Sequence, residues 1–314
     1  MLDALLGILA WAHQFTYGLG WLVVGAFVAG AALETYDRNL ARPVVVAAWG
    51  LFAAFWFTLI EYYLVIQKSA VEGVGTLVAI PLCLYVGYRL YHGRDSLFVL
   101  SRAIAAMGLI YVPFVTIPAL RQLLIEVVTD QTRAAMGLLG YDATVVGGLH
   151  LENGMRIASK VYPYDSTFLY WDGDEPITYT IRIACTGIGS MAVVGGLVAA
   201  VRAPLDRKLR ALAIAIPIIW VLNIVRNVFI SLSLGEQAMH VLPDLVMTLF
   251  SVTDPRMVSY YVADRIIAQS LSVVALVAIT WLVVREVPEV LTILEDVIEL
   301  ATGRRYDLRG AMDV

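Results

Sequence analysis

Three side chains with chemical potential lie near one end of three different apolar stretches of this sequence. They are Cys185, Arg226 and Arg265. Counted from the basic residues at the opposite ends of the stretches, at about 1.5 Å per helical residue, they lie roughly 25, 24 and 30 Å along their helices. Since the hydrocarbon core of a bilayer is about 30 Å thick, we expect all three near one membrane boundary.

A thiol beside two guanidinium groups is suited to nucleophilic attack on a carbonyl. The thiolate is the attacking form of cysteine, and a neighbouring cation favours it. Arginine stays protonated when partly desolvated, so one arginine can stabilise the thiolate while another binds the developing oxyanion. The pattern predicts Cys185 as the nucleophile, with Arg226 and Arg265 dividing these two roles. Gly187 and Gly189 would allow a peptide backbone to approach closely.

Each of these residues also has a structural interpretation. A cysteine in an apolar helix is commonly a small buried side chain, which is our interpretation of Cys83 and an alternative for Cys185. Arg265 could extend to the membrane interface from a helix end. The polar stripe that Arg226 shares with Asn227 could serve helix packing.

Four further residues are candidates for supporting roles. Asn223 belongs to the same stripe as Arg226. Asp264 is expected either to orient a guanidinium or to face water. Glu61 is expected to pair with an arginine rather than to act in catalysis, and His240 to be a surface residue rather than a base.

Some kinds of site are not expected from the sequence. It has no metal-ligand spacing, no serine-centred elbow and no glycine-rich phosphate loop, so no metal and no cofactor are predicted. Tyr260 and Tyr261 are interpreted as part of an interfacial aromatic belt.

The composition indicates where these residues must be held. Of 314 residues, 60% are hydrophobic and 15% charged, and the mean hydropathy is +0.78. Soluble domains are less apolar and more charged, which excludes a soluble enzyme and a disordered chain. Two cysteines exclude a disulfide scaffold, and a net charge of −4 without a basic cluster excludes a nucleic-acid-binding protein. We predict an all-α polytopic membrane protein.

The predicted helix bundle has seven or eight transmembrane helices. Seven apolar stretches are long enough to span, and the apolar piece 2–11 is either a short eighth span or an interfacial helix. The seven are 17–33, 43–66, 74–90, 103–120, 186–201, 211–231 and 266–284. Residues 241–252 are apolar but are interrupted by Pro243 and Asp244, which indicates a re-entrant or interfacial segment.

Basic residues set the expected orientation. Those in the short loop 202–210 place that loop in the cytoplasm, and the longest polar segment, 124–182, then falls outside. Within it, a small β-hairpin is predicted from 167–171 and 177–183. An amphipathic helix over 287–300 is expected near the cytoplasmic surface. The predicted parts are 1–123 (N-terminal spans), 124–182 (extracytoplasmic segment), 183–285 (catalytic helices) and 286–314 (cytoplasmic tail).

Three short motifs resemble the exosortase/archaeosortase family, and its archaeal branch most closely. They are Ala184-Cys185-Thr186-Gly187-Ile188 with Ser190, then Asn223-Ile224-Val225-Arg226-Asn227, then Ala263-Asp264-Arg265. Exosortases typically have histidine where Arg265 stands, and arginine there is similar to the archaeal branch. The resemblance is specific over 183–284, whereas the first 120 residues match only as a generic multispan region.

The resemblance implies a membrane-embedded cysteine protease or transpeptidase with its active site facing the extracytoplasmic side of the cell membrane. The implied substrates are secreted proteins, such as S-layer glycoprotein, that end in a Pro-Gly-Phe motif, a transmembrane helix and a basic segment. The implied acceptor is a membrane lipid, an archaeal phospholipid. The excess of 19 arginines over three lysines suits a haloarchaeal source.

Two other classes of function remain open from the residues alone. The outer arginines of a transporter or scaffold could bind an anion or a lipid headgroup, with Cys185 incidental. A lipid or glycolipid transferase could work without a covalent enzyme intermediate. Dependence of activity on the Cys185 thiol would separate the cysteine protease or transpeptidase from both of these alternatives.

Overall fold

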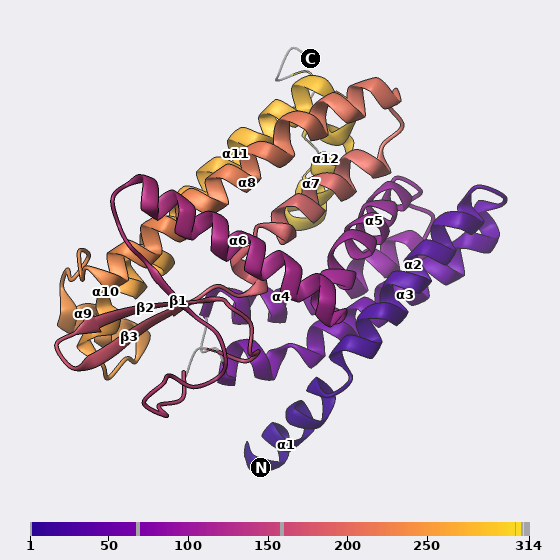
Figure 1. Ribbon diagram of the computed structural model, residues 1–314. Coiled ribbons are helices and arrows are strands. Elements are labelled where there is room, and N and C mark those ends of the chain that lie inside the picture. Colours follow the sequence, from indigo (N-terminus) through magenta and orange to yellow (C-terminus); the bar gives the residue numbers. More distant parts are fainter. Residues whose placement is uncertain (1, 67–69, 158–159, 305, 309, 311–314) are drawn as a thin grey trace. The chain divides into compact units, whose positions relative to one another are not determined.

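The computed structural model describes residues 2–66, 70–157, 160–304, 306–308 and 310 (Figure 1). Within these residues, six helices are long and apolar enough to cross a membrane. They are Thr16–Glu34, Arg38–Leu64, Glu72–Tyr91, Leu97–Thr116, Leu205–Gly235 and Pro255–Glu286. The predicted fold class, a helical polytopic membrane protein with a small β insertion, is confirmed.

The number of long spans differs from the seven or eight expected. The stretch 186–201 forms α7 (Ile188–Ala200), whose 13 residues extend only about 20 Å. The N-terminal piece forms α1 (Leu2–His13), which is 12 residues long. Both helices are therefore shorter than a hydrocarbon core of about 30 Å.

The chain divides into two compact units. The first comprises residues 1–112, 192–212 and 283–314, and the second comprises 113–191 and 213–282. The first contains α1, α2 (Thr16–Glu34), α3 (Arg38–Thr58), a π-helical turn (Tyr62–Ile66), α4 (Ala70–Tyr91), most of α5 (Leu97–Thr116) and of α7, the start of α8 (Leu205–Gly235), a 3-10 turn (Pro288–Val290) and α12 (Leu291–Thr302).

Small residues allow close helix packing in the first unit. A Cβ atom on Gly196 of α7 would lie 2.3 Å from the Met107 side chain of α5, so only glycine fits there. Polar side chains pair inside this unit as well: the Trp49 indole donates to Ser101 Oγ at 2.9 Å. A side chain that satisfies its hydrogen bond inside the bundle avoids the cost of a buried unpaired polar group.

The basic residues of the first unit form ion pairs. Arg102 donates to both carboxylate oxygens of Glu34, whose side chain is only 4% exposed. Arg94 donates to Asp296 at 2.6 Å and to both oxygens of Glu299 at 2.8 Å. Arg94 lies in the turn between α4 and α5, and its partners belong to α12. The predicted amphipathic tail helix is thus present, and a two-carboxylate ion pair fastens it.

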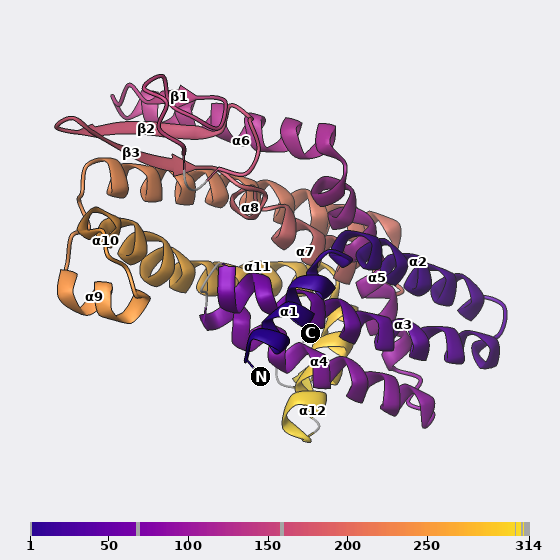
Figure 2. The same ribbon diagram turned by 90° about the horizontal axis from the view of Figure 1, so that it is seen from below.

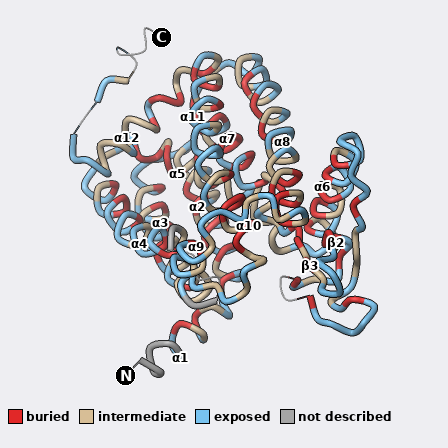
Figure 3. Tube along the Cα trace, turned by 90° about the vertical axis from the view of Figure 1, so that its left-hand side faces the viewer, coloured by how far each residue is buried: buried red, intermediate tan, exposed pale blue. Residues whose placement is uncertain are grey.

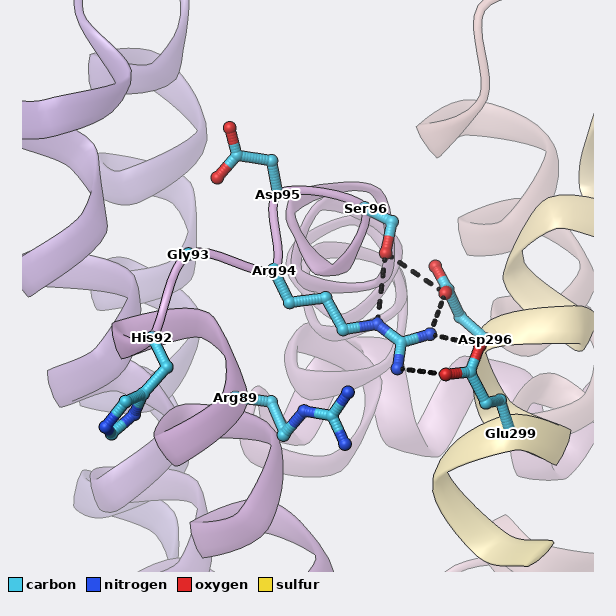
Figure 4. Close-up of a pocket in the computed structure, with 8 residues that line it drawn as sticks. All are labelled: Arg89, His92, Gly93, Arg94, Asp95, Ser96, Asp296 and Glu299. Atoms are coloured by element: carbon cyan, nitrogen blue, oxygen red, sulfur yellow. Dashed lines mark hydrogen bonds and ion pairs between the residues drawn. The ribbon is translucent and has the colours of Figure 1, made fainter. Parts of the chain in front are cut away.

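Figure 4 shows this ion pair in the wall of a polar pocket of about 450 Å³. The pocket is lined by Arg89, His92, Gly93, Arg94, Asp95, Ser96, Asp296 and Glu299. All of these residues belong to the first unit. None of them is a predicted site residue.

The second unit contains α6 (Pro118–Leu138), three strands, a 3-10 turn (Ile183–Cys185), the larger part of α8 and the elements that follow it. The strands are β1 (Thr144–Val146), β2 (Thr167–Asp172) and β3 (Glu175–Thr180). After α8 come α9 (Pro243–Phe250), a 3-10 turn (Pro255–Met257), α10 (Val258–Tyr260), a π-helical stretch (Tyr261–Ala268) and α11 (Gln269–Glu286).

The predicted hairpin is confirmed and extended. Strands β2 and β3 pair antiparallel from Thr167 opposite Thr180 to Asp172 opposite Glu175, and β1 adds a third strand on β2. The turn between β2 and β3 needs Gly173, whose φ of +61° is a conformation that glycine adopts without steric cost. Helix α6 was not predicted, because its polar composition was interpreted as part of an extracytoplasmic segment.

The sheet lies on one side of α8, with α9 and α10 on the other (Figure 2). Strand β2 approaches the end of α8 closely: a Cβ atom on Gly235 would come within 2.4 Å of the Tyr170 ring. The Tyr170 hydroxyl is also hydrogen-bonded to Ser231 Oγ at 2.7 Å. These contacts fix the hairpin against the helix that carries Arg226.

Segment 241–252 forms the short helix α9. It is bounded by Leu242 and Ser251, two non-glycine residues with positive φ of 48° and 52°. One face of α9 packs on the π-helical stretch, where the Phe250 and Tyr261 rings stack at 4.8 Å. The opposite face exposes Leu245, and Figure 3 shows that exposed residues also run along α11.

Candidate active site

Cys185 is the last residue of a 3-10 turn, ahead of α7 rather than inside it. The depth expected for Cys185 assumed a continuous α-helix from 185 onward and is wrong in that detail. The turn is closed by Thr186, whose hydroxyl donates to the Ile183 carbonyl at 2.7 Å. Gly187 follows with a φ of +78°, which favours glycine and interrupts the helix. Cys185 itself is half-buried.

Two asparagines of α8 hold the Cys185 backbone. Asn223 donates from Nδ2 to the Cys185 carbonyl oxygen at 2.6 Å, and Asn227 donates to the same oxygen at 2.8 Å. The two asparagines are four residues apart, which places them on one face of the helix. The predicted polar stripe therefore binds the segment that carries the thiol.

A buried carboxylate joins the two predicted arginines. Arg226 donates from Nη2 to Asp264 Oδ1 at 2.5 Å, and Arg265 Nε lies 3.5 Å from Asp264 Oδ2. The Asp264 side chain is only 10% exposed, so it contacts the two guanidiniums rather than facing water. Arg226 Nε is buried and has no hydrogen-bond partner within the described residues.

The backbone around Asp264 and Arg265 is a π-helical stretch of eight residues, Tyr261–Ala268. Widened helical turns of this kind are uncommon and are frequent at functional sites. The apolar pattern of the sequence predicted an ordinary helix here. It contained no sign of the widening, because π-helical turns share their residue types with α-helices.

Two tyrosines complete the surroundings of the thiol. Tyr179 of β3 is buried and donates from its hydroxyl to Asn227 Oδ1 at 3.3 Å. The Tyr260 ring lies 6.4 Å from the Tyr179 ring, and Tyr260 interacts electrostatically with Cys185 and Asp264. Tyr260, interpreted from the sequence as part of an aromatic belt, instead lies against the predicted site.

Burial raises the pKa of Tyr179 well above its ordinary value, and the nearby Cys185 and Asp264 raise it further. Its hydroxyl therefore stays protonated and remains a hydrogen-bond donor. The sequence did not identify Tyr179 as a site residue. The available signal was strand alternation, since Ile177, Tyr179 and Ile181 share the buried face of the hairpin.

The two other supporting candidates, His240 and Glu61, lie elsewhere in the chain. His240 is exposed in the loop between α8 and α9 and, within the described part of the chain, makes no hydrogen bond or ion pair. Glu61 belongs to the first unit, beside its π-helical turn. The remaining predicted residues, Cys185, Asn223, Arg226, Asp264 and Arg265, all lie in the second unit.

The assembled group suits acyl transfer. The group contains a half-buried thiol together with two guanidiniums that share one carboxylate, so its cations outnumber its anions. Arg226 interacts electrostatically with Cys185. Among the described residues, no group of three or more His, Cys, Asp or Glu side chains could hold a metal ion.

Comparison with known proteins identifies the family of the chain. The family model for transmembrane exosortases matches residues 11–254, a range that includes Cys185 and Arg226 but ends before Arg265. Archaeosortase A of Haloferax volcanii is 48% identical over 304 residues, which cover 94% of this chain and 96% of that relative. Archaeosortase A of Natronomonas pharaonis is 44% identical over 305 residues, with 95% and 93% covered. No solved structure matches the chain.

These matches extend well beyond the three motifs to nearly the whole chain. They also favour an enzyme over the transporter or scaffold that the residues alone left open. The chain is a multi-pass membrane protein of the exosortase/archaeosortase family, a membrane-embedded enzyme that processes the C-terminal signals of other proteins.

Proposed function

We propose that processing by this chain depends on Cys185 as a covalent nucleophile. The observation that carries the proposal is the Asp264 carboxylate, which contacts both Arg226 and Arg265 beside the thiol. Asp264 keeps two mutually repelling cations in one place. One of them can then face the sulfur while the other faces the carbonyl oxygen of the substrate.

The proposed reaction has two steps. The Cys185 thiol loses its proton to water, and the thiolate attacks the carbonyl carbon of the scissile peptide. Arg226, with its unpaired Nε, donates to the oxyanion that forms. The C–N bond then breaks, the leaving amine takes a proton from Tyr260 or from water, and a thioester remains on Cys185. A hydroxyl group of a lipid headgroup, or water, attacks the thioester, gives up its proton to the Tyr260 oxygen or to water, and releases the thiolate as the ester or free acid forms.

The proposed substrates are secreted proteins with a C-terminal Pro-Gly-Phe motif, an apolar helix and a basic end, of which S-layer glycoprotein is one. The proposed acceptor is a membrane phospholipid. We further propose that the site faces the extracytoplasmic side. This orientation agrees with the basic residues of the loop 202–210, which the positive-inside rule assigns to the cytoplasm.

Replacement of the nucleophile tests the proposal directly. Cys185→Ala is expected to abolish cleavage of a reporter that carries this signal, at unchanged protein level in the membrane. Cys185→Ser is expected to be nearly as inactive, because a hydroxyl needs a stronger base than arginine provides. Cys83→Ser is the matched control and should retain full cleavage.

A trapping experiment identifies the intermediate. Wild-type membranes incubated with the reporter and quenched in acid should contain a Cys185-linked acyl enzyme, which hydroxylamine releases. Substantial cleavage by Cys185→Ala would mean that the chain works without this nucleophile.

A further inference from the structure

The β-hairpin reaches the thiol through a chain of two hydrogen bonds. Tyr179 on β3 donates to Asn227 Oδ1 at 3.3 Å, and Asn227 donates from Nδ2 to the Cys185 carbonyl oxygen at 2.8 Å. Tyr179 and Asn227 are both buried, and Asn227 has no exposed surface at all. The path therefore runs through the interior of the second unit.

The order of donors along this path follows from the chemistry of the groups. A carbonyl oxygen only accepts, so the side of Asn227 that faces Cys185 must be its NH₂ group. The Oδ1 atom then faces the strand and needs a donor, which the Tyr179 hydroxyl supplies. Tyr179 thus fixes which way the Asn227 amide points, and that orientation decides whether Cys185 is held.

The segment held in this way is also restrained locally ahead of α7, where the Cys185 N–H donates to the Arg182 carbonyl at 2.8 Å. Thr186 closes the 3-10 turn through the Ile183 carbonyl, and Gly187 has a backbone conformation that interrupts the helix. The two asparagine donors fix the peptide between these points. With the peptide fixed, the position of the sulfur depends only on rotation about the Cα–Cβ bond of Cys185.

We propose that Tyr179 and Asn227 are positioning residues, which hold the Cys185 peptide so that its sulfur is presented to the substrate carbonyl. The β-hairpin then helps to position the nucleophile, in addition to packing against α8. This inference rests on the proposed role of Cys185 as nucleophile. Neither residue touches substrate in this scheme: the Tyr179 hydroxyl orients the Asn227 amide, and Asn227 holds the Cys185 peptide.

The chain supplies a matched control pair one helical turn further along. Tyr170 of β2 is hydrogen-bonded to Ser231 of α8 at 2.7 Å, in the same sheet-to-helix arrangement. Ser231, like Asn227, has no exposed surface, but this second pair has no hydrogen bond to Cys185. A general effect of hairpin docking would appear in both pairs, whereas a positioning effect appears only in the first.

The test compares the kcat and KM of reporter cleavage in membranes at equal protein level, with thermal unfolding of each variant measured alongside. We expect Tyr179→Phe to lower kcat about tenfold and Asn227→Ala about 100-fold, both with little change in KM, because displacement of a reacting group by about 1 Å has effects of this size. Tyr170→Phe and Ser231→Ala should stay within about twofold of wild type.

A double variant gives the sharpest readout. Since Tyr179 acts through Asn227, the combination Tyr179→Phe/Asn227→Ala should be no slower than Asn227→Ala alone. Equal losses in Tyr179→Phe and Tyr170→Phe, or multiplied losses in the double variant, would overturn the positioning role. Activity in Cys185→Ala would instead overturn the nucleophile, so the two failures are distinguishable.

Discussion

At the scale of single residues, Asp264 decides how the two arginines can work. Its two oxygens are shared between Arg226 and Arg265, at 2.5 and 3.5 Å. The shorter contact binds Nη2 of Arg226 to Asp264, while the buried Nε of the same guanidinium has no hydrogen-bond partner among the described residues. The longer contact restrains Arg265 less. The two guanidiniums are therefore unequal, although they share one partner.

This inequality predicts different tolerance to substitution. Arg226→Lys is expected to be almost inactive, because a single ammonium cannot bind Asp264 and donate in a planar fork to an oxyanion as well. Arg265→His and Arg265→Lys should keep measurable cleavage, since a nearby donor or cation is enough there. A time course of reporter cleavage at equal protein level measures this. An inactive Arg265→His beside an active Arg226→Lys would exchange the two roles.

At the scale of elements, the segments around the site are joined by ion pairs as well as by hydrogen bonds. Arg256, in the 3-10 turn before α10, donates to Asp254 at 3.0 Å and forms an ion pair with Glu175 of β3. The hairpin tip is thus tied to the entry of the last long span. Hydrogen bonding to Arg256 lowers the pKa of Asp254, although burial opposes this shift.

A pH dependence of stability follows from that lowered pKa. A carboxyl whose pKa is lower in the folded state stabilises the protein above its unfolded pKa of about 3.9, and the contribution is lost as pH falls through the folded value. Asp254→Asn should therefore unfold at a lower temperature than wild type at pH 7. The difference should begin to shrink near pH 4 and disappear once the pH lies below the lowered pKa of Asp254. A difference that persists in acid would show that the carboxylate charge is not its cause.

The same elements show what the sequence could predict and why the rest was missed. Apolar length and alternation predicted the long spans and the hairpin, because both patterns are local. The π-helical stretch and the Cys185 turn were missed, because their geometry depends on contacts with α8. The hydrogen bonds from Asn223 and Asn227 end on a backbone carbonyl, which no residue type reveals. Arg226 and Arg265 were predicted because charged residues in apolar stretches are conspicuous.

At the scale of the whole molecule, the orientation in the membrane is a prediction independent of catalysis. In a background without Cys83 and Cys185, a single cysteine in place of Asp172, in the hairpin, is expected outside the cell. One in place of Asp206, at the start of α8, is expected in the cytoplasm. A membrane-impermeant maleimide added to intact cells should label only the first. Labelling of the second alone would reverse the orientation and move the site to the other side of the membrane.

The ion pair between Arg94 and α12 forms late when the chain is synthesised and folds. Arg94 and Glu299 are 205 residues apart, so a ribosome must add at least 205 residues after Arg94 before this contact can form. Contacts between such distant residues form late, because closing a long loop costs chain entropy. The N-terminal helices of the first unit are therefore made first, and α12 joins them last. A chain that ends before α12 would leave Arg94 without its two carboxylate partners.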